Sequence, residues 1–297
     1  MVDSLLSALE TNPTSTIQLL KTQTIPSFPM FTCTNCKCDV CRWIIQLGYF
    51  APVETTIFKH ILNNDTWEND AMVVDVGANV GYFSAYATTM GCRVASFEPN
   101  PHPRQFLLAT SSVHDLHHTK WQVYHDLHHT KWQVYPVAIG KEENEALFTT
   151  SIPWGASHIA RQMLQLDNDF VKVQVIPLHK VVKEDVVLLK IDTEGYEIDV
   201  IEGSEQLFKD HVVHNVVIGV KNFNDPNKRD FMHHLKEIGH FTHVYSYHDS
   251  YDYDRISLEF EDLKPRFFDV TEIIGNKKYN EIIPYEDLWF CKQPISF

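Results

Sequence analysis

The sequence predicts an α/β protein built on a doubly wound, mostly parallel sheet of seven strands. From residue 71 onwards, short apolar runs alternate with amphipathic stretches, as expected of a sheet that helices cover on both faces. One run, VVLLKID (186–192), is almost continuously apolar, which is typical of a strand buried on both faces. Another run leads into a glycine-containing turn, VVDVGANVGYF (73–83), as at the first strand-to-helix junction of nucleotide-binding folds.

The elements are expected in a regular order after an N-terminal helical extension, residues 1–70. This extension is interpreted as helical because WIIQLGYFAPVETTIFKHIL (43–62) carries apolar residues at roughly helical spacing. Residues 71–297 then form the sheet domain. Its expected strands are 71–76, 93–99, 132–140, 186–192, 215–223, 242–248 and 288–293, and its expected helices are 81–91, 102–112, 196–208 and 227–239.

One segment of this domain is duplicated. HDLHHTKWQVY occupies residues 114–124 and is repeated letter for letter at 125–135. Two copies are too few for a repeat architecture, in which several units stack. Only the second copy continues into PVAIG (136–140) to complete the third strand, so we expect the first copy to form a surface loop.

Composition and charge exclude several classes of partner. The chain has 297 residues, and Lys+Arg 25 against Asp+Glu 39 gives a net charge of −14, which disfavours binding to nucleic acid. No apolar run approaches the length of a membrane span, and the N-terminal segment carries Asp3 and Glu10 where a secretory signal would be basic. We therefore expect a cytoplasmic protein with no nucleic-acid or membrane partner.

The cysteines are concentrated in one short segment. Of the six, four lie in CTNCKCDVC, at Cys33, Cys36, Cys38 and Cys41, which does not resemble the disulfide framework of a secreted fold. The two C-x-x-C pairs are separated by a single residue, far less than the usual spacer in zinc sites. We expect reduced cysteines and no bound metal. A zinc ion held by all four thiolates is the alternative that the sequence leaves open.

The turn after the first strand favours S-adenosylmethionine over a nicotinamide dinucleotide. A pyrophosphate needs the pattern G-x-G-x-x-G, whereas this turn has Gly77, Asn79 and Gly81. Asp75 precedes it and supplies an acid for the ammonium group of a methionyl tail. Glu98 ends the second strand, 17 residues after Gly81, where a carboxylate accepts hydrogen bonds from ribose hydroxyls.

Three ordered motifs resemble the FkbM-type S-adenosylmethionine-dependent methyltransferases: VVDVGANVGYFSAYA, SFEPNP and LLKIDTEGYEIDVIEGSEQLF. The resemblance covers roughly residues 71–293 and includes the late LWFCK strand. It implies a class I methyltransferase fold and methylation of a hydroxyl on a sugar or another small natural product. By position, the resemblance implies that Asp75, Gly77, Asn79, Gly81, Glu98 and Asn100 bind the cofactor, and that Asp192 and Glu194 face the transferred methyl group.

The chemistry requires a group that removes the hydroxyl proton, and Asp192 is the first candidate and Glu194 the second. Both acids are alternatively caps of the helix expected from residue 196, where carboxylates are favourable. PWGASH (153–158) lies in an expected loop that could reach the substrate.

Lys221 stands where the family often has an acid, which leaves a catalytically inactive binding or scaffold protein as one alternative function. A nicotinamide-dependent oxidoreductase is another, disfavoured by Asn79.

Overall fold

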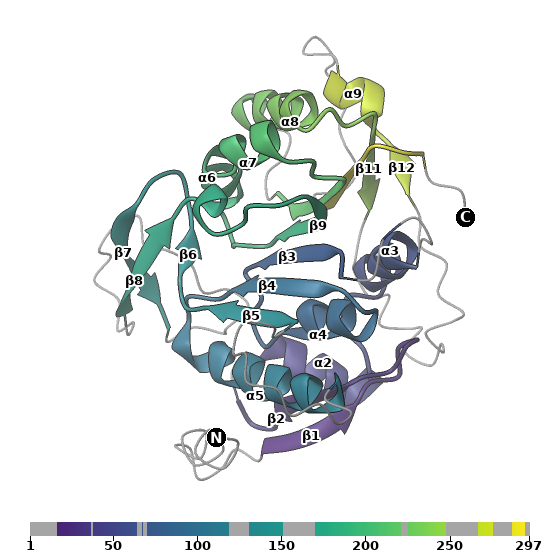
Figure 1. Cartoon of the computed structure of the whole chain (residues 1–297), viewed down its shortest axis with the longest axis vertical. Helices are drawn as coiled ribbons and strands as arrows, with labels where there is room; N and C mark the ends of the chain where they lie inside the picture. The colour runs from purple at the N-terminus through teal and green to yellow at the C-terminus, as the bar shows by residue number, and fades with distance from the viewer. Residues whose placement is uncertain are drawn as a thin grey trace.

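The structure, a computed structural model, describes residues 17–36, 38–63, 67, 70–118, 131–150, 170–220, 225–247, 267–275 and 287–294. Its main sheet runs through the centre of the molecule (Figure 1). In the described part of the chain the strand order is β12-β11-β13-β10-β9-β3-β4-β5. These strands are β3 (Met72–Val76), β4 (Arg93–Phe97), β5 (Trp132–Tyr135), β9 (Val186–Ile191), β10 (Asn215–Gly219), β11 (His243–Tyr247), β12 (Phe268–Asp269) and β13 (Asp287–Cys291).

This sheet confirms the predicted fold class. The strands β5, β4, β3, β9 and β10 are parallel neighbours, and β13 joins them antiparallel between β10 and β11. All seven predicted strands contribute to it, although the third does so only through its first half, β5. A two-residue strand that was not predicted, β12, is added at the edge beside β11.

Helices cover both faces of the sheet. Neighbouring strand residues point to opposite sides, so a continuously apolar strand has apolar side chains on both faces. Leu188 packs into the core beneath one set of helices, and Leu189 packs into the core beneath the other. None of the described helices is long and apolar enough to cross a lipid bilayer. The helices are α3 (Pro52–Leu62), α4 (Tyr82–Thr89) and α5 (Pro101–His118) on the first face, and α6 (Glu197–Glu202), α7 (Glu205–Asp210), α8 (Pro226–Ile238) and α9 (Thr271–Gly275) on the second (Figure 1).

The predicted helix 196–208 is divided into α6 and α7 at Gly203. A Cβ atom on Gly203 would lie 2.0 Å from the carbonyl oxygen of Gly140, so the chain makes a close backbone contact at this point. The hydroxyl of Ser204 donates to the carbonyl of Val200 at 2.6 Å. The close contact and this hydrogen bond accompany the break between the two helices.

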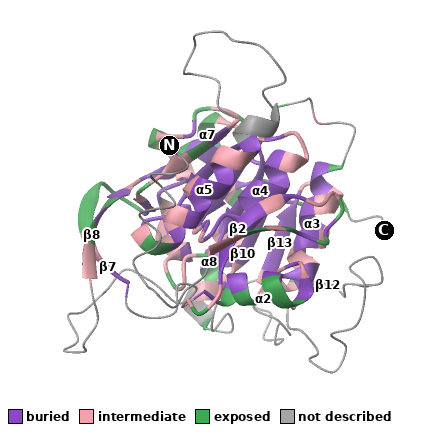
Figure 2. Ribbon diagram, turned by 90° about the horizontal axis from the view of Figure 1, so that it is seen from below, coloured by how far each residue is buried: buried purple, intermediate pink, exposed green. Residues whose placement is uncertain are grey.

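The N-terminal extension is only partly helical, which corrects the prediction. Its described part begins with an antiparallel hairpin of β1 (Ile17–Lys21) and β2 (Pro29–Cys33), followed by α2 (Asp39–Leu47) and α3. The N–H of Phe31 donates to Thr110 on α5 at 3.1 Å, and the Phe28 ring packs against Tyr82 and Tyr86 of α4. The helix α4 is therefore buried along almost its whole length (Figure 2). The boundary at residue 70 stays a prediction.

A second, three-stranded sheet was not predicted. It consists of β6 (Ala138–Ile139), β7 (Asn144–Thr149) and β8 (Phe170–Ile176), with β8 in the middle. The expected single strand 132–140 is thus two strands in two sheets. The chain leaves the main sheet at Pro136, which has no N–H to donate to a strand ladder.

The duplicated segment begins as helix, which corrects the expectation that its first copy is wholly a loop. The helix α5 continues to His118, five residues into that copy. His114 is buried, its Nε2 lies 3.0 Å from the carbonyl oxygen of Pro29, and its ring packs against Trp132 with centroids 5.6 Å apart. Residues 119–130 lie outside the described residues.

Deleting residues 114–124 is expected to leave a folded protein. Because the copies are identical, the shortened chain still has a histidine after Val113 and a tryptophan before Gln133. Six residues would then lie between that histidine and that tryptophan, which is enough chain to let the two rings stay in contact. Loop length affects closure entropy weakly, so thermal or urea denaturation should show a change of at most about 1–2 kcal/mol. A variant that stays unfolded would show that both copies are integral to the core.

Candidate active site

A cavity of about 340 Å³ opens where β3, β4 and β9 end. These strands are parallel neighbours, so their carboxyl ends lie together at one edge of the sheet. After β3 the chain adds β4 and β5 on one side, whereas β9 and β10 lie on the other. The cavity is thus at the point where the strand order reverses, the usual ligand site of doubly wound sheets.

The turn after β3 is held between the two neighbouring strands. The N–H of Gly77 donates to the carbonyl of Phe97 at 2.9 Å, and the N–H of Asp192 donates to the carbonyl of Val76 at 3.0 Å. Gly77 has φ 84, and a Cβ atom there would lie 1.8 Å from the carbonyl oxygen of Asp192. Glycine is therefore required at this position both by conformation and by space.

Glu98 and Asn79 meet at the next part of the cavity wall. The carboxylate of Glu98 accepts the N–H of Asn79 at 2.8 Å and the N–H of Asn100 at 2.7 Å, one at each oxygen. Each oxygen keeps acceptor capacity for a further donor. Burial raises the pKa of Glu98 to about 7, although the two N–H donors act in the opposite direction. The side-chain oxygen of Asn79 is buried and has no hydrogen-bond partner among the described residues.

Asp75, in contrast, lies outside the cavity lining that the structure describes. It ends a buried chain of hydrogen bonds: the indole N–H of Trp132 donates to Ser96 at 2.7 Å, the hydroxyls of Ser96 and Ser84 are 2.7 Å apart, and Ser84 donates to Asp75 at 2.6 Å. Burial is the main reason that the pKa of Asp75 is raised. Its other oxygen, Oδ1, is buried without a partner among the described residues.

Gly81 and Asn100 also support the site without belonging to the described cavity lining. Gly81 has φ 87 at the start of α4, and a Cβ atom there would lie 2.4 Å from the Leu107 side chain. Asn100 donates its N–H to Glu98, and its side-chain oxygen accepts the N–H of His102 at the start of α5. Both residues therefore fix helices against the strands that carry the cavity.

Asp192 lines the cavity together with a lysine that the sequence analysis missed. Lys190 is buried, and its Nζ lies 3.4 Å from Asp192, 3.9 Å from Glu54 and 5.1 Å from the centre of the Phe83 ring. Burial alone would lower the pKa of Lys190, but the carboxylates of Asp192, Glu54 and Asp75 outweigh it and raise that pKa. The signal in the sequence was a lysine inside an otherwise apolar run, VVLLKI.

Glu194 also lines the cavity, in a turn that Glu197 organises. One carboxylate oxygen of Glu197 accepts the N–H of Thr193 at 3.2 Å, the hydroxyl of Thr193 at 3.1 Å and the N–H of Gly195 at 2.8 Å. The sequence left open whether Asp192 and Glu194 cap the helix that follows. At these donors the capping residue is Glu197. Sequence reasoning missed this residue because a glutamate in a first helical turn is ordinary.

Residues 75–254 match the family model of the methyltransferase FkbM domain, which is more than half of the chain. The chain belongs to the FkbM methyltransferase family. This confirms the resemblance of the three sequence motifs. No curated protein shows significant similarity to the chain.

Solved methyltransferases are also similar to this FkbM family member, at low identity. The methyltransferase FkbM from Methylobacillus flagellatus is 18% identical with a TM-score of 0.35; the match covers 52% of this chain and 34% of that one, about a third of its length. A putative methyltransferase from an antibiotic biosynthesis pathway of Anabaena variabilis is 12% identical, with 65% and 66% covered and a TM-score of 0.30. The precorrin-6y C5,15-methyltransferase from Geobacter metallireducens is 10% identical, with 79% and 85% covered and a TM-score of 0.34.

The cavity of this FkbM family member is acidic and partly apolar. Its lining includes the carboxylates of Asp39, Glu98, Asp192 and Glu194, against the ammonium of Lys190. The N-terminal extension contributes Asp39, Val40 and Phe50 to it, which no sequence motif indicated. An excess of carboxylates favours a cationic ligand over a phosphate. The PWGASH segment and Lys221 lie outside the described residues.

Proposed function

We propose that this methyltransferase transfers the methyl group of S-adenosylmethionine to a hydroxyl of a small molecule, a sugar or another natural product. The observation that carries the proposal is the meeting of Glu98, Asn79 and Asp192 in one cavity at the carboxyl ends of β3, β4 and β9. The cavity volume of about 340 Å³ is in the range of small-molecule sites.

The residues present fit this cofactor. Glu98 has acceptor capacity for two ribose hydroxyls, and it is fixed by the N–H groups of Asn79 and Asn100. The buried side-chain oxygen of Asn79 is a further acceptor, and no described residue donates a hydrogen bond to it. The ammonium group of the cofactor would supply such a donor. The net negative lining suits a sulfonium ion and disfavours the pyrophosphate of a nicotinamide dinucleotide.

The residues around the cavity have distinct tasks in such a reaction. Bound S-adenosylmethionine supplies an electrophilic methyl group, so the protein must orient a hydroxyl in line with it and take up the hydroxyl proton. Asp192 is the proton acceptor in this proposal, held in place by Lys190 at 3.4 Å. Tyr82, Phe83, Phe97 and Phe148 give the cavity apolar walls that exclude water.

Calorimetry with S-adenosylmethionine and with NAD tests the cofactor directly. We expect saturable binding of S-adenosylmethionine and much weaker binding of NAD, and the reverse preference would overturn the assignment. Cell extracts incubated with the protein and isotopically labelled S-adenosylmethionine then identify the acceptor by mass spectrometry. A labelled product that gains its methyl group on oxygen supports the proposal, whereas label on carbon or nitrogen contradicts the hydroxyl acceptor.

Glu98→Gln is expected to weaken S-adenosylmethionine binding by about 1.5–3 kcal/mol, the range for a hydrogen bond to a charged group. Glutamine also brings an NH₂ group toward the N–H of Asn79 or Asn100, which leaves one donor unpaired. Calorimetry measures the affinity, and Glu237→Gln on the exposed face of α8 is the matched control. Unchanged affinity in Glu98→Gln would remove Glu98 from the cofactor site.

The affinity of the wild-type protein should fall as the pH falls through about 7. Burial raises the pKa of Glu98 to about 7, so its carboxylate is mainly ionised at pH 8 and mainly protonated at pH 6. If the ionised form binds the ribose, each pH unit below the pKa costs up to about tenfold in affinity. The Glu98→Gln variant lacks this carboxyl group, so its pH profile shows how much of the change in affinity comes from titration of the cofactor itself. Parallel pH profiles for the two proteins would contradict the role of Glu98.

A further inference from the structure

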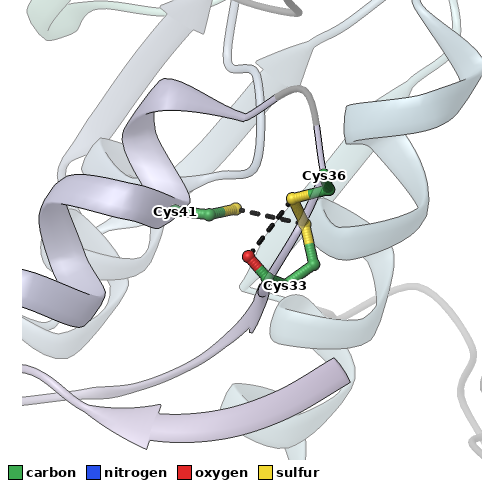
Figure 3. Close-up of side chains that lie close together, drawn as sticks. All are labelled: Cys33, Cys36 and Cys41. Carbon is green, nitrogen blue, oxygen red and sulfur yellow. Dashed lines mark hydrogen bonds between the residues drawn. A yellow bond between two sulfur atoms is a disulfide. The ribbon is translucent and has the colours of Figure 1, made fainter. Parts of the chain in front are cut away.

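Four cysteines gather where β2 ends and α2 begins. Cys33 is the last residue of β2, Cys36 lies in the turn, Cys38 is the N-cap of α2 and Cys41 is in its first turn. The structure joins Cys33 to Cys36 and Cys38 to Cys41 as disulfides. The sulfur atoms of Cys33, Cys36 and Cys41 all lie within 4.8 Å of one another (Figure 3).

We propose that these four cysteines, as thiolates, bind one structural zinc ion. The sulfur atoms of Cys33 and Cys41, which belong to different pairs, are 3.8 Å apart. Zinc binds four thiolates tetrahedrally at about 2.3 Å, which places neighbouring sulfur atoms about 3.8 Å apart. One sulfur atom of each pair is thus already at the separation that a shared ion requires, and the sulfur of Cys38 must move closer to complete the tetrahedron.

The short spacer between the pairs is compatible with this site. The end of β2 and the start of α2 converge at the turn. This convergence brings the sulfur atoms of Cys33 and Cys41 together across a separation of eight positions. A long spacer is needed when each pair belongs to its own knuckle, but here one strand end, one turn and one helix start supply all four sulfur atoms.

The start of α2 also favours thiolates. The sulfur of Cys38 accepts the N–H of Cys41 at 3.0 Å, and both residues lie at the N-terminus of a nine-residue helix. The partial positive charge of a helix N-terminus stabilises a thiolate, and N–H donors to sulfur stabilise it further. In the binding reaction four thiols and one Zn²⁺ give a tetrathiolate complex of charge −2 and four protons.

The cluster is enclosed but reachable. Cys33, Cys38 and Cys41 are buried, whereas Cys36 is partly exposed. A surface cavity of about 440 Å³ is lined by Cys33, Cys36 and Cys38, so an ion has a path to the sulfur atoms.

The cysteine cluster is connected to the active-site cavity through α2. The helix α2 carries Asp39 and Val40, which line the cavity at the ends of β3, β4 and β9. A zinc ion at the start of α2 would fix that wall. Zinc binding by these cysteines would be independent of the identity of the methyl donor or acceptor.

Thiol counting and metal analysis of the purified full chain distinguish zinc from disulfides. The chain has six cysteines, and Cys92 and Cys291 are free in the structure. A zinc site predicts about one zinc per chain and six reactive thiols after denaturation with a chelator and without reductant. Two reactive thiols and no zinc would overturn the proposal in favour of the disulfides.

A second test uses Co²⁺ as a probe and one matched pair of variants. Reduced protein stripped of metal should bind one equivalent of Co²⁺ with the visible bands and thiolate charge-transfer absorption of a tetrahedral tetrathiolate. We expect Cys36→Ser to weaken or abolish this binding and Cys92→Ala, which removes a buried cysteine elsewhere, to retain it. Equal Co²⁺ spectra and equal zinc content in the two variants would refute the site.

Discussion

Asp192→Asn is expected to lower the rate of methyl transfer by about 10²–10⁴-fold, the usual contribution of a positioned general base. The carboxylate lies at the end of β9 in the cavity wall, 3.4 Å from the buried ammonium of Lys190. Asparagine has nearly the same shape but cannot accept the hydroxyl proton. Single-turnover methyl transfer measures the loss, with the acceptor that labelled extracts identify.

Two further readouts separate proton transfer from a structural role of Asp192. The N–H groups of Thr193 and Gly195 are bound by Glu197, so Asp192→Asn should leave the start of α6 intact. Lys190 also keeps Glu54 at 3.9 Å. The melting temperature and S-adenosylmethionine affinity of the variant should therefore stay close to wild type.

Glu194→Gln is the matched variant, because Glu194 lines the same cavity. We expect it to retain most of the activity that Asp192→Asn loses. Normal turnover in Asp192→Asn with a large loss in Glu194→Gln would transfer the role of base to Glu194. Parallel losses of stability and activity in Asp192→Asn would instead make Asp192 a structural residue.

The core of the site was predictable because it depends on local patterns. Apolar runs located β3, β4 and β9, and the carboxyl ends of parallel strands meet at one edge. Gly77, Asn79, Glu98, Asp192 and Glu194 therefore line one cavity, as their motif positions predict.

What the sequence could not reveal depends on the direction of side chains and on distant contacts. Asp75 is one residue away from the cavity-lining Val76, but it is bound by Ser84 of α4 and is absent from the described lining. The contribution of Asp39 and Phe50 requires the N-terminal extension to dock on the sheet, and no local pattern encodes that contact. For β8 a signal existed: FVKVQVI alternates apolar and polar residues, as a half-buried strand does.

Gly77→Ala is expected to reduce stability by about 2–6 kcal/mol, from the strain of a non-glycine residue at positive φ together with overpacking. The added Cβ would lie 1.8 Å from the carbonyl oxygen of Asp192, so β3 and β9 must separate at the cavity. That movement weakens the hydrogen bond that Asp192 donates to Val76 between these two strands. Thermal denaturation and calorimetry with S-adenosylmethionine should show lower stability and loss of binding together.

Gly91→Ala separates the two causes, because Gly91 has φ 95 but no atom within 4 Å of an added Cβ. It sits between α4 and β4, at the end of the sheet opposite the cavity. Its expected cost is the conformational strain alone, about 1–3 kcal/mol, with cofactor affinity unchanged. If Gly77→Ala were no worse than Gly91→Ala in either measurement, the close contact between the turn and the Asp192 backbone would not shape the site. The larger loss in Gly77→Ala follows if that contact sets the distance between β3 and β9 at the cavity.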